Sequence, residues 1–306
     1  MIIVRTPLRL SIAGGGTDIP SWYQEHGSIF VSAAIDKYIY LTLQKSPYNS
    51  KINLRYSEIE EVEKTKDIKH DIIRATLQYF NITEPCQITS HADIPAGTGL
   101  GSSGSFGVAM AHILFPRIIT EVLARDASKI QMESLHYPIG LQDQYAAAYG
   151  GIRKYTISKE GVVDQTPFDT PVLSEKLALF YTGQKRSATQ ILAHSSHEGL
   201  QEVQDIGLKQ IEALEGQNYD NYGYLLNEHW LAKKKRHPEM SSPQIDEWYD
   251  LGLKNGALGG KLIGAGGGGF LMFYTNEPEK LIKAMPLYHQ PFTFDEGSKI
   301  IYEDIS

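Results

Sequence analysis

Cysteine is almost absent from this sequence, and so are long apolar runs and any excess of positive charge. Cys86 is the one cysteine among 306 residues, so no disulfide can form within the chain, and this usage fits a reducing compartment. No segment has the apolar stretch of a signal peptide or a membrane span. Lys and Arg number 29 against 36 Asp and Glu, a formal net charge of −7, which disfavours nucleic acid and anionic membranes as partners. We therefore expect a cytoplasmic protein.

The length of the chain and the order of its expected elements predict the domain organisation. A chain of 306 residues fits one large domain or two of ordinary size. The stretch from Thr166 to Ser174 contains two prolines, and we place a boundary there, which gives domains at 1–170 and 171–306. Expected strands and helices alternate in both halves, which indicates an α/β or α+β fold.

Hydrophobic periodicity predicts the main elements. Apolar residues at odd positions from residue 29 to residue 43 indicate strands with a break at Asp36 and Lys37. Residues 67–80 have a helical apolar face, with Asp67 as the expected N-cap. We expect further strands at 86–92, at 177–183, on both sides of Gly161 and on both sides of the glycines at 264–269. Further helices are expected at 103–115, at 118–135, within 138–151 and between residues 187 and 257.

The run GLGSSG at residues 99–104 raises three interpretations. It matches G-x-G-x-x-G, but a dinucleotide site needs a buried strand directly before it and an acid about 20 residues later. Here residues 93–96 intervene, and Glu121 lies in an expected helix. A Walker A loop is excluded because no Gly-Lys-Ser/Thr follows. A simple glycine-rich turn before a helix is the second interpretation. The third is a phosphate cradle, because free N–H groups at a helix start and serine hydroxyls bind anions.

Two further motifs lie far from this loop along the chain. TPLRLSIAGGGTD at 6–18 combines Arg9, a glycine turn and Asp18, and KLIGAGGGGF at 261–270 is a second glycine-rich loop. PAGTGLGSSG at 95–104 lies between them. Taken in their order along the chain, the three segments resemble the three motifs of the GHMP kinase family. The resemblance implies a two-domain α+β fold with an α/β-like N-terminal half. It pairs an N-terminal ribosomal-S5-domain-2-like domain with a C-terminal ferredoxin-like domain. It also implies a kinase that uses ATP and Mg²⁺.

Longer segments resemble the sugar-kinase branch of this family that acts on D-glycero-D-manno-heptose 7-phosphate. They include AGGGTDIPSWYQEHG, AAIDKYIYLTL, PIGLQDQYAAAYGG, FYTGQKRSATQIL and NGALGGKLIGAGGGGF, and they cover almost the whole chain. That branch transfers the γ-phosphate of ATP to the anomeric O1 and gives the 1,7-bisphosphate, toward nucleotide-activated heptose for surface polysaccharide. The alternatives are a kinase for another sugar or a mevalonate-type substrate, a catalytically silent sensor of the same family, and a dinucleotide-dependent oxidoreductase.

The resemblance also implies roles for individual residues. Asp143 in GLQDQ matches the catalytic base, and Arg9 matches the position beside it, where its charge would keep the carboxylate ionised. Without the resemblance, Asp143 would be interpreted as a helix cap, Arg9 as a surface cation and Asp18 as a turn residue. The expected substrate-binding residues are Gly15, Gly16, Thr17, Asp18, Gly267 and Gly268. The expected ATP-binding residues are Pro95, Gly97, Thr98, Gly99, Leu100, Gly101, Ser102, Ser103, Gly104 and Ser105.

The expected metal site departs from the family pattern. The resemblance implies that Mg²⁺ binds the hydroxyl of a loop serine, here Ser103, and a glutamate. The family's glutamate position falls at Gln131 or Met132 in this chain. Either Glu133 ligates the metal from a shifted position, or Ser103, phosphates and water hold it, since Mg²⁺ often keeps several waters.

Two basic segments have different expected fates. Lys185 and Arg186 stand between an expected strand and an expected helix, and we expect them to bind the distal phosphate of a phosphorylated sugar. The alternative is an exposed basic turn. The run from Lys233 to Arg236 occupies consecutive helix positions that cannot share one face, so we expect most of it to be solvated, while one member could aid anionic ligands. The expected partners are a sugar phosphate and ATP, with no nucleic acid and no membrane, and a homodimer is left open.

Overall fold

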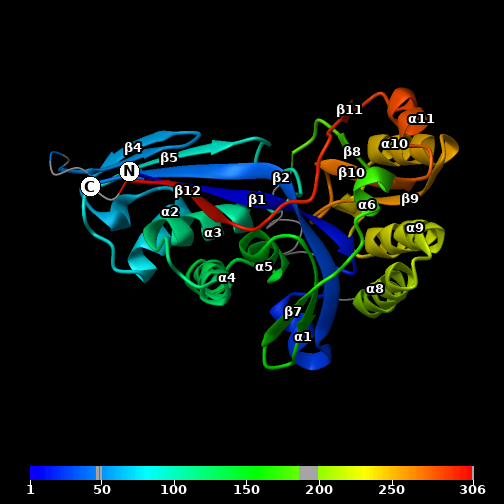
Figure 1. The fold of residues 1–306 in the computed structure, drawn as a ribbon, viewed down its shortest axis with the longest axis horizontal. Helices are drawn as coiled ribbons and strands as arrows, with labels where there is room; N and C mark the ends of the chain where they lie inside the picture. The colour runs from blue at the N-terminus through cyan, green and yellow to red at the C-terminus, as the bar shows by residue number, and fades with distance from the viewer. Residues whose placement is uncertain (46–47, 49, 186–198, 305–306) are drawn as a thin grey trace.

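The computed structural model describes residues 1–45, 48, 50–185 and 199–304, and the elements below are those of these residues. Its first sheet has eight strands in the order β12-β1-β2-β5-β3-β4, with β6 paired to both β2 and β7. The strands are β1 (Ile2–Ala13), β2 (Ser28–Gln44), β3 (Ile52–Arg55), β4 (Ile59–Val62), β5 (Gln87–Ala92), β6 (Ile152–Ile157), β7 (Val163–Pro167) and β12 (Lys299–Glu303). β1 and β2 run together from this sheet into the middle of the molecule (Figure 1).

The break expected in the long strand is a bulge of two residues within β2. Pro7 of β1 is opposite Tyr38, but the next residue, Leu8, is opposite Ile35. Two residues of β2 therefore have no partner on β1 at this point. Because side chains alternate with a period of two, an insertion of two residues leaves the later side chains on the same face. The apolar residues at odd positions thus face one side of the sheet along the whole of β2.

Helices cover one face of this sheet, below it in Figure 1. They are α2 (Asp71–Tyr79), α3 (Ser102–Leu114), α4 (Thr120–Lys129) and α5 (Gln142–Tyr149), and the short α1 (Pro20–His26) follows the glycine turn after β1. The helices expected at 103–115 and within 138–151 are confirmed by α3 and α5.

The helix expected from residue 67 begins later, and Asp67 is not its N-cap. Thr65–Asp67 is a short 3₁₀ turn, and His70 caps α2 by accepting an N–H of the first turn with its ring Nδ1 at 3.4 Å. The N–H groups of Lys69 and His70 donate to the Glu60 carboxylate of β4 at 2.6 and 3.2 Å. A backbone whose N–H groups bond to a side chain is withdrawn from the helix, so α2 starts after these residues.

The helix expected over residues 118–135 is α4 followed by a π-helical turn at Ile130–Ser134. The N–H of Leu135 donates to the C=O of Ile130, five residues back, at 3.1 Å. A π-turn of this kind inserts one residue into a helix and turns the side chains that follow to new directions. It decides which of the polar side chains between residues 131 and 133 reaches the interior.

The second sheet has the order β11-β8-β10-β9. Its strands are β8 (Leu177–Tyr181), β9 (Ala257–Leu262), β10 (Phe270–Thr275) and β11 (Tyr288–His289). Its helices are α6 (Leu173–Lys176), α8 (Leu200–Glu215), α9 (Tyr219–Lys235), α10 (Pro243–Lys254) and α11 (Pro278–Ala284), with a 3₁₀ turn at Pro238–Met240. The expected strand at 177–183 and the expected hairpins around Gly161 and around 264–269 are confirmed.

The end of the chain returns to the first sheet. β12 pairs antiparallel with β1, Ile2 lies opposite Glu303, and the two termini are close together (Figure 1). The boundary predicted at residues 170 and 171 falls between β7 and α6. The segment assigned to the second domain nevertheless ends in a strand of the first sheet, so sequence position alone does not assign this strand. The division into 1–170 and 171–306 stays a prediction.

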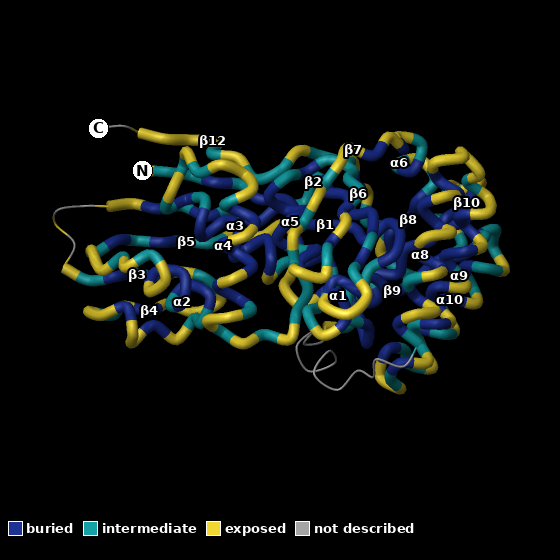
Figure 2. Tube along the Cα trace, turned by 90° about the horizontal axis from the view of Figure 1, so that it is seen from below, coloured by how far each residue is buried: buried dark blue, intermediate teal, exposed yellow. Residues whose placement is uncertain are grey.

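Buried contacts join the two halves near the end of β1. The N–H of Gly14 donates to Gln210 Oε1 at 3.0 Å, and the Tyr222 hydroxyl donates to the C=O of Ile12 at 3.0 Å. One cluster of buried apolar side chains continues from β1 and β2 to α8, α9 and β10, and Figure 2 shows buried positions along the middle of the molecule in dark blue. The glycine turn after β1 is therefore held between the two halves.

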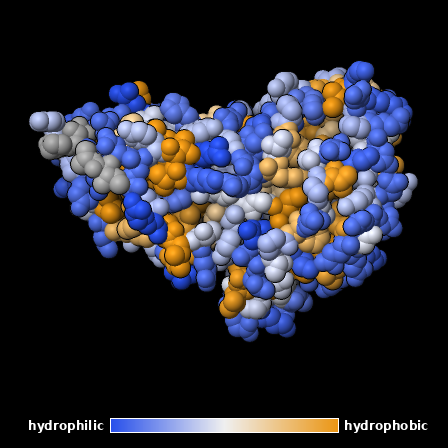
Figure 3. Space-filling view, viewed as in Figure 1, coloured by the Kyte–Doolittle hydropathy of each residue, from blue (hydrophilic) through white to orange (hydrophobic). Residues whose placement is uncertain are grey.

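Figure 3 shows how hydropathy is distributed over one face of the molecule. On the face drawn in Figure 3, hydrophilic side chains predominate and apolar side chains form separate patches on both halves. No helix in the described part of the chain is long and apolar enough to cross a membrane.

Candidate active site

A cavity of about 960 Å³ lies where the two halves meet. Its walls come from the glycine turn after β1, the loop that leads into α3, the starts of α2 and α5, the end of α9 and the loop between β9 and β10. This volume is at the upper end of the range for small-molecule sites. It is large enough for two ligands side by side, and the three sequence motifs meet in it.

Arg9 and Asp143 form a salt bridge in the wall of this cavity. Arg9 Nε and Nη2 lie 2.9 and 2.8 Å from Asp143 Oδ1, and Arg9 Nη1 donates to the C=O of Gly99 at 2.6 Å. The Arg9 side chain is 6% exposed and the Asp143 side chain 32%. The guanidinium therefore lies behind the carboxylate, which faces the cavity. The two residues expected to act together are in direct contact, and Arg9 also fixes the glycine loop.

Two glycines allow the carboxylate to lie against the loop. A Cβ at Gly104 would stand 2.4 Å from Asp143 Cβ, and a Cβ at Gly101 would stand 3.0 Å from Arg9 Cγ. Asp143 is in the first turn of α5, whereas the two glycines begin α3. The starts of both helices thus approach each other more closely than any side chain would permit.

Asp18 bonds within the glycine turn, as a turn residue does, and it also lines the cavity, where a sugar contact is expected. Its Oδ1 accepts the N–H of Gly16 at 3.2 Å, as a turn residue does, and its Oδ2 accepts the N–H of Gln142 at 2.9 Å at the start of α5. It is buried and lines the cavity together with Gly15 and Gly16. Burial raises the pKa of Asp18 and the charge of Asp143 adds to the rise, while the bond from Gln142 opposes it.

The loop before α3 presents backbone to the cavity. Its lining residues are Gly97, Gly99, Gly101, Ser102, Ser103 and Gly104. Gly101 is the N-cap of α3 and supplies no side-chain cap, so the N–H groups of the first turn remain for an anion. Four of the expected ATP-binding residues, Pro95, Thr98, Leu100 and Ser105, do not line the cavity. They shape the loop: Ser105 Oγ, for example, donates to the C=O of Pro7 at 2.7 Å.

The loop between β9 and β10 packs directly on the first glycine loop. A Cβ at Gly264 would stand 2.5 Å from Gly99 Cα, and one at Gly269 would stand 2.1 Å from the C=O of Thr98. Gly268 lines the cavity, whereas the N–H of Gly267 donates to Met240 C=O at 3.1 Å, and Gly267 is not in the cavity wall. Gly264, Ala265 and Gly266 of the same loop line the cavity, although Gly267 does not.

Of the two expected arrangements of the metal site, the one with Glu133 needs a side chain that reaches the cavity, and Glu133 does not line it. Gln131 is the residue that reaches inward: its Nε2 donates to the C=O of Ser103 at 2.9 Å, and its Oε1 accepts from Gln144 at 2.8 Å. Glu133 is exposed and does not line the cavity, because side chains two residues apart on a helix point to roughly opposite sides. Among the described residues, no group of three or more His, Cys, Asp or Glu side chains could hold a metal.

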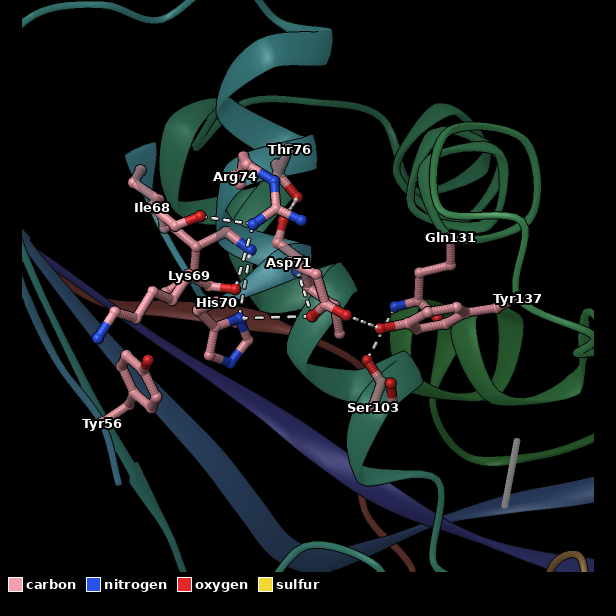
Figure 4. A network of polar contacts seen from close by, with 12 residues as sticks. Tyr56, Ile68, Lys69, His70, Asp71, Arg74, Thr76, Ser103, Gln131 and Tyr137 are labelled. Carbon is pink, nitrogen blue, oxygen red and sulfur yellow. Dashed lines mark hydrogen bonds and ion pairs between the residues drawn. The ribbon is translucent and has the colours of Figure 1, made fainter. Parts of the chain in front are cut away.

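An aromatic wall adjoins the loop, and Figure 4 shows two of its members, Tyr56 and His70, beside a network of polar contacts. The His70 ring stacks on Phe106 with centroids 4.8 Å apart and meets the Tyr56 ring edge-on at 4.7 Å. Burial lowers the pKa of His70, which favours the uncharged ring. The Tyr137 hydroxyl donates to the Asp71 carboxylate at the mouth of this region. The stacked rings of His70 and Phe106 beside a phosphate-binding loop would suit a nucleobase.

Cations that the sequence analysis did not assign line the cavity beside the glycine turn. Lys233 and Arg236 come from the end of α9, and Lys261 comes from β9. Burial lowers the pKa of Lys261 to about 7, and the charge of Arg9 adds to the effect. Burial likewise lowers the pKa of Lys233 and of Arg236. The expectation of a mostly solvated run was wrong for these two positions, and a lysine inside the apolar strand around Lys261 was the available sequence sign.

Besides Gly267, two of the described residues that were expected to bind the sugar, Thr17 and Lys185, do not line the cavity. The Thr17 hydroxyl is buried against Ser28 Oγ at 2.7 Å. Lys185 is exposed and does not line the cavity. Arg186 lies outside the described residues. Of the residues expected to contact the sugar, Gly15, Gly16, Asp18 and Gly268 are the ones in the cavity wall.

Comparison with known proteins agrees with this arrangement. The family model "GHMP kinases N terminal domain" matches residues 67–151, and "GHMP kinases C terminal" matches residues 209–289. A D-glycero-alpha-D-manno-heptose 7-phosphate kinase of Campylobacter jejuni is 31% identical over 334 residues, with 97% of this chain and 98% of the relative covered.

Solved structures show the same fold. The crystal structure of a D-glycero-D-manno-heptose 1-phosphate kinase from Bacteroides thetaiotaomicron has a TM-score of 0.81 at 22% identity and covers 100% of both chains. A putative sugar kinase from Campylobacter jejuni has a TM-score of 0.77 at 30% identity, with 98% of this chain and 97% of that chain covered. The chain therefore belongs to the GHMP kinase family, and it is a phosphotransferase that uses ATP as donor and an alcohol group as acceptor.

Proposed function

We propose that this protein transfers the γ-phosphate of ATP to the anomeric O1 of D-glycero-D-manno-heptose 7-phosphate and gives the 1,7-bisphosphate. The observation that carries the proposal is the Arg9–Asp143 pair, which lies between the backbone of the phosphate-binding loop and the glycine turn with Asp18. The choice of sugar is supported by the relative from Campylobacter jejuni, whose name specifies that substrate. The product would feed the synthesis of nucleotide-activated heptose for surface polysaccharide.

Asp143 is the proposed general base. Both bonds from Arg9 go to Oδ1, and in the described part of the chain no hydrogen bond engages Oδ2. Oδ2 is thus available to accept the proton of the sugar hydroxyl as that oxygen attacks phosphorus. Arg9 holds the carboxylate in place and offsets negative charge that develops on the transferred phosphoryl group.

The loop at the start of α3 is the proposed site of the ATP phosphates. Ser102, Ser103 and Gly104 line the cavity in the first turn of α3, whose N-cap Gly101 offers no side-chain cap, and phosphate oxygens are the anions that such a helix start favours. The aromatic wall around His70 would take the adenine, and Gly15, Gly16 and Asp18 would take the sugar. Asp143 lies between these regions, so the two substrates would meet at its carboxylate.

Mg²⁺ fits this site in a restricted way. The protein offers the Ser103 hydroxyl beside the phosphate loop, while Gln131, one of the two residues that match the family's glutamate position, is a neutral amide engaged by Gln144. We propose that Ser103, the ATP phosphates and water hold the ion, as is common for Mg²⁺. When bound, it would neutralise charge on the β- and γ-phosphates. Arg9 and the backbone of the loop would then position the ATP phosphates.

The experiment that tests the function is a coupled assay of ADP release over a panel of sugars and sugar phosphates. We expect turnover with heptose 7-phosphate in the presence of ATP and Mg²⁺, and phosphorus NMR of the product should show a new anomeric phosphate. If only mevalonate or only another sugar is turned over, the proposed acceptor is wrong, but the proposed phosphoryl transfer from ATP stands. The neutral Gln131 favours one other candidate, a silent sensor of the same fold. Binding of both ligands without any ADP release would establish that candidate instead.

A further inference from the structure

The glycine turn after β1 has a backbone conformation that other residues rarely adopt. Gly14, Gly15 and Gly16 have φ angles of +63°, +86° and +89°, and all three line the cavity. Glycine reaches this region without steric cost, but it loses more conformational freedom than any other residue when its backbone is fixed. The shape of the proposed acceptor site therefore depends on the groups that hold this turn from outside.

Two side chains hold N–H groups of the turn, one from each half of the molecule. Asp18 Oδ1 accepts the N–H of Gly16, and Asp18 Oδ2 accepts the N–H of Gln142 at the start of α5. On the opposite side, Gln210 Oε1 of α8 accepts the N–H of Gly14 at 3.0 Å. The turn is thus held between α5, which carries the proposed base, and α8 of the second half.

α8 packs against the turn with no side chain between them. A Cβ at Gly207 would stand 2.7 Å from Gly14 Cα, and Figure 1 shows the end of β1 beside α8 and α9. Gly207 and Gln210 are three residues apart, so they lie on the same face of the helix. The close approach at Gly207 brings the amide of Gln210 within hydrogen-bond distance of the turn.

The amide of Gln210 matches both of its backbone partners. Its Oε1 accepts from Gly14, and its Nε2 donates to the C=O of Leu225 in α9 at 3.2 Å. An amide supplies one acceptor and two donors, whereas an ionised carboxylate only accepts and a thioether does not donate. The side chain is 0% exposed, so water cannot replace these bonds. Gln210 therefore links the turn to both α8 and α9.

We propose that Gln210 is a positioning residue for the acceptor. It holds Gly14 so that the turn presents the sugar hydroxyl to Asp143, and it acts through the turn without touching the reacting atoms. The inference rests on the proposed function, because it takes the glycine turn as the acceptor site. Without this bond the turn shifts and the acceptor binds more weakly. The phosphate-binding loop is held by Arg9 instead, so ATP binding does not depend on Gln210.

The same helix offers a matched control. Gln204 Oε1 of α8 accepts a hydrogen bond from Trp22 Nε1 of α1, and neither residue lines the cavity. Gln204→Met and Gln210→Met each remove one amide with which α8 contacts the first half, but only Gln210 contacts the turn. An effect that both variants share therefore reports the contact between the halves and not the position of the turn.

A third variant separates positioning from stability. In either protonation state, Gln210→Glu keeps an oxygen that can accept the N–H of Gly14. A buried carboxylate is costly, however, so this variant should have a lower free energy of unfolding than wild type. If Gln210 acts by positioning, acceptor binding should follow the bond to Gly14 and not the stability of the fold.

The test combines steady-state kinetics on heptose 7-phosphate and ATP with urea unfolding. Gln210→Met should raise KM for the acceptor about fivefold to tenfold, the factor that corresponds to one buried hydrogen bond, while KM for ATP stays close to wild type. Gln210→Glu should have an acceptor KM nearer to wild type than Gln210→Met, although its fold is destabilised. Gln204→Met should match wild type in both KM values. An equal rise in KM for ATP, or an acceptor KM that follows the free energy of unfolding across the three variants, would overturn the proposal.

A second measurement does not depend on the identity of the sugar. The N–H of Gly14 is protected from hydrogen exchange by its bond to Gln210, so peptides that contain Gly14 should exchange faster in Gln210→Met than in wild type or Gln204→Met. Unchanged exchange in Gln210→Met would refute the role of this residue. If wild type does not turn over heptose 7-phosphate, the proposed substrate is wrong. The exchange measurement still decides whether Gln210 holds the turn, and the kinetics are then compared with the acceptor that the panel identifies.

Discussion

Replacing Asp143 by Asn tests the catalytic proposal with the smallest change of shape. Both bonds from Arg9 end on Oδ1, at 2.9 and 2.8 Å, and an amide oxygen in that position can still accept them. The amide nitrogen would then stand where Oδ2 faces the cavity, and an NH₂ group cannot accept the sugar's proton. The variant thus keeps the packing against Gly104 and loses the base.

The expected size of the effect follows from that geometry. Loss of a general base lowers the rate by about 10²–10⁴-fold, which corresponds to about 3–5 kcal/mol in the activation barrier. The Asp143 side chain is 32% exposed, so loss of its charge should lower the free energy of unfolding by only about 1–2 kcal/mol. We therefore expect kcat to fall by two to four orders of magnitude in a protein that is still folded and still binds ATP.

The assay is kcat at saturating ATP and acceptor, with ATP affinity measured separately by calorimetry. Asp246→Asn is the matched control, because it removes a carboxylate that pairs with Lys234 outside the cavity. A kcat of Asp143→Asn near that of the control would refute the reasoning. Asp143 would then only hold Arg9 and the start of α5, and the proton would leave the sugar by another route.

Three further outcomes are expected. Glu133→Gln should leave the Mg²⁺ dependence of activity unchanged, since the side chain is exposed and outside the cavity; a raised Mg²⁺ requirement in a titration would return Glu133 to the metal site. Gly104→Ala should lower the free energy of unfolding by about 1–3 kcal/mol and reduce kcat, because its Cβ would meet Asp143 Cβ at 2.4 Å; urea unfolding with wild-type stability and activity would contradict this packing. In the unliganded protein, the Lys261 pKa of about 7 is far below its ordinary value of 10.5. The unfolded chain therefore binds more protons above pH 7, so the Lys261 contribution should raise stability as pH rises from 7 to 9. Urea unfolding at both pH values should show a smaller rise in Lys261→Met than in wild type, and an equal rise would be inconsistent with a buried, destabilised ammonium.

Much of the fold could be predicted because its signals are local. Period-two alternation along β2, the helical face of α3 and the glycines between β9 and β10 each specify one element within a short stretch of chain. The errors occur where a distant group competes. Asp67 fails as an N-cap because the Glu60 carboxylate takes the N–H groups of Lys69 and His70. No pattern within residues 67–80 reports that contact.

The same distinction applies to the candidate site. The motifs around Arg9, Gly99 and Asp143 identified a kinase, and the structure brings these residues together in one wall. Lys261 is the first residue of the KLIGAGGGGF motif and Arg236 the last of the basic run, but no sequence pattern placed either of them in the site. They come from a strand and from a helix end, and they become neighbours of the glycine turn only after the two halves have packed.

From the sequence alone, the resemblance of three motifs determined the family and the donor nucleotide and implied that Arg9 lies beside Asp143. Such motifs are recognisable because a backbone that binds phosphate needs glycines at particular spacings. Only the tertiary structure decided that Gln131 rather than Glu133 points inward. It also decided that Lys261 is buried with a lowered pKa and that β12 closes the first sheet beside β1. These properties depend on burial and on contacts between segments far apart in the chain. Burial and long-range contacts arise from packing of the whole chain, so no local stretch of residues specifies them alone.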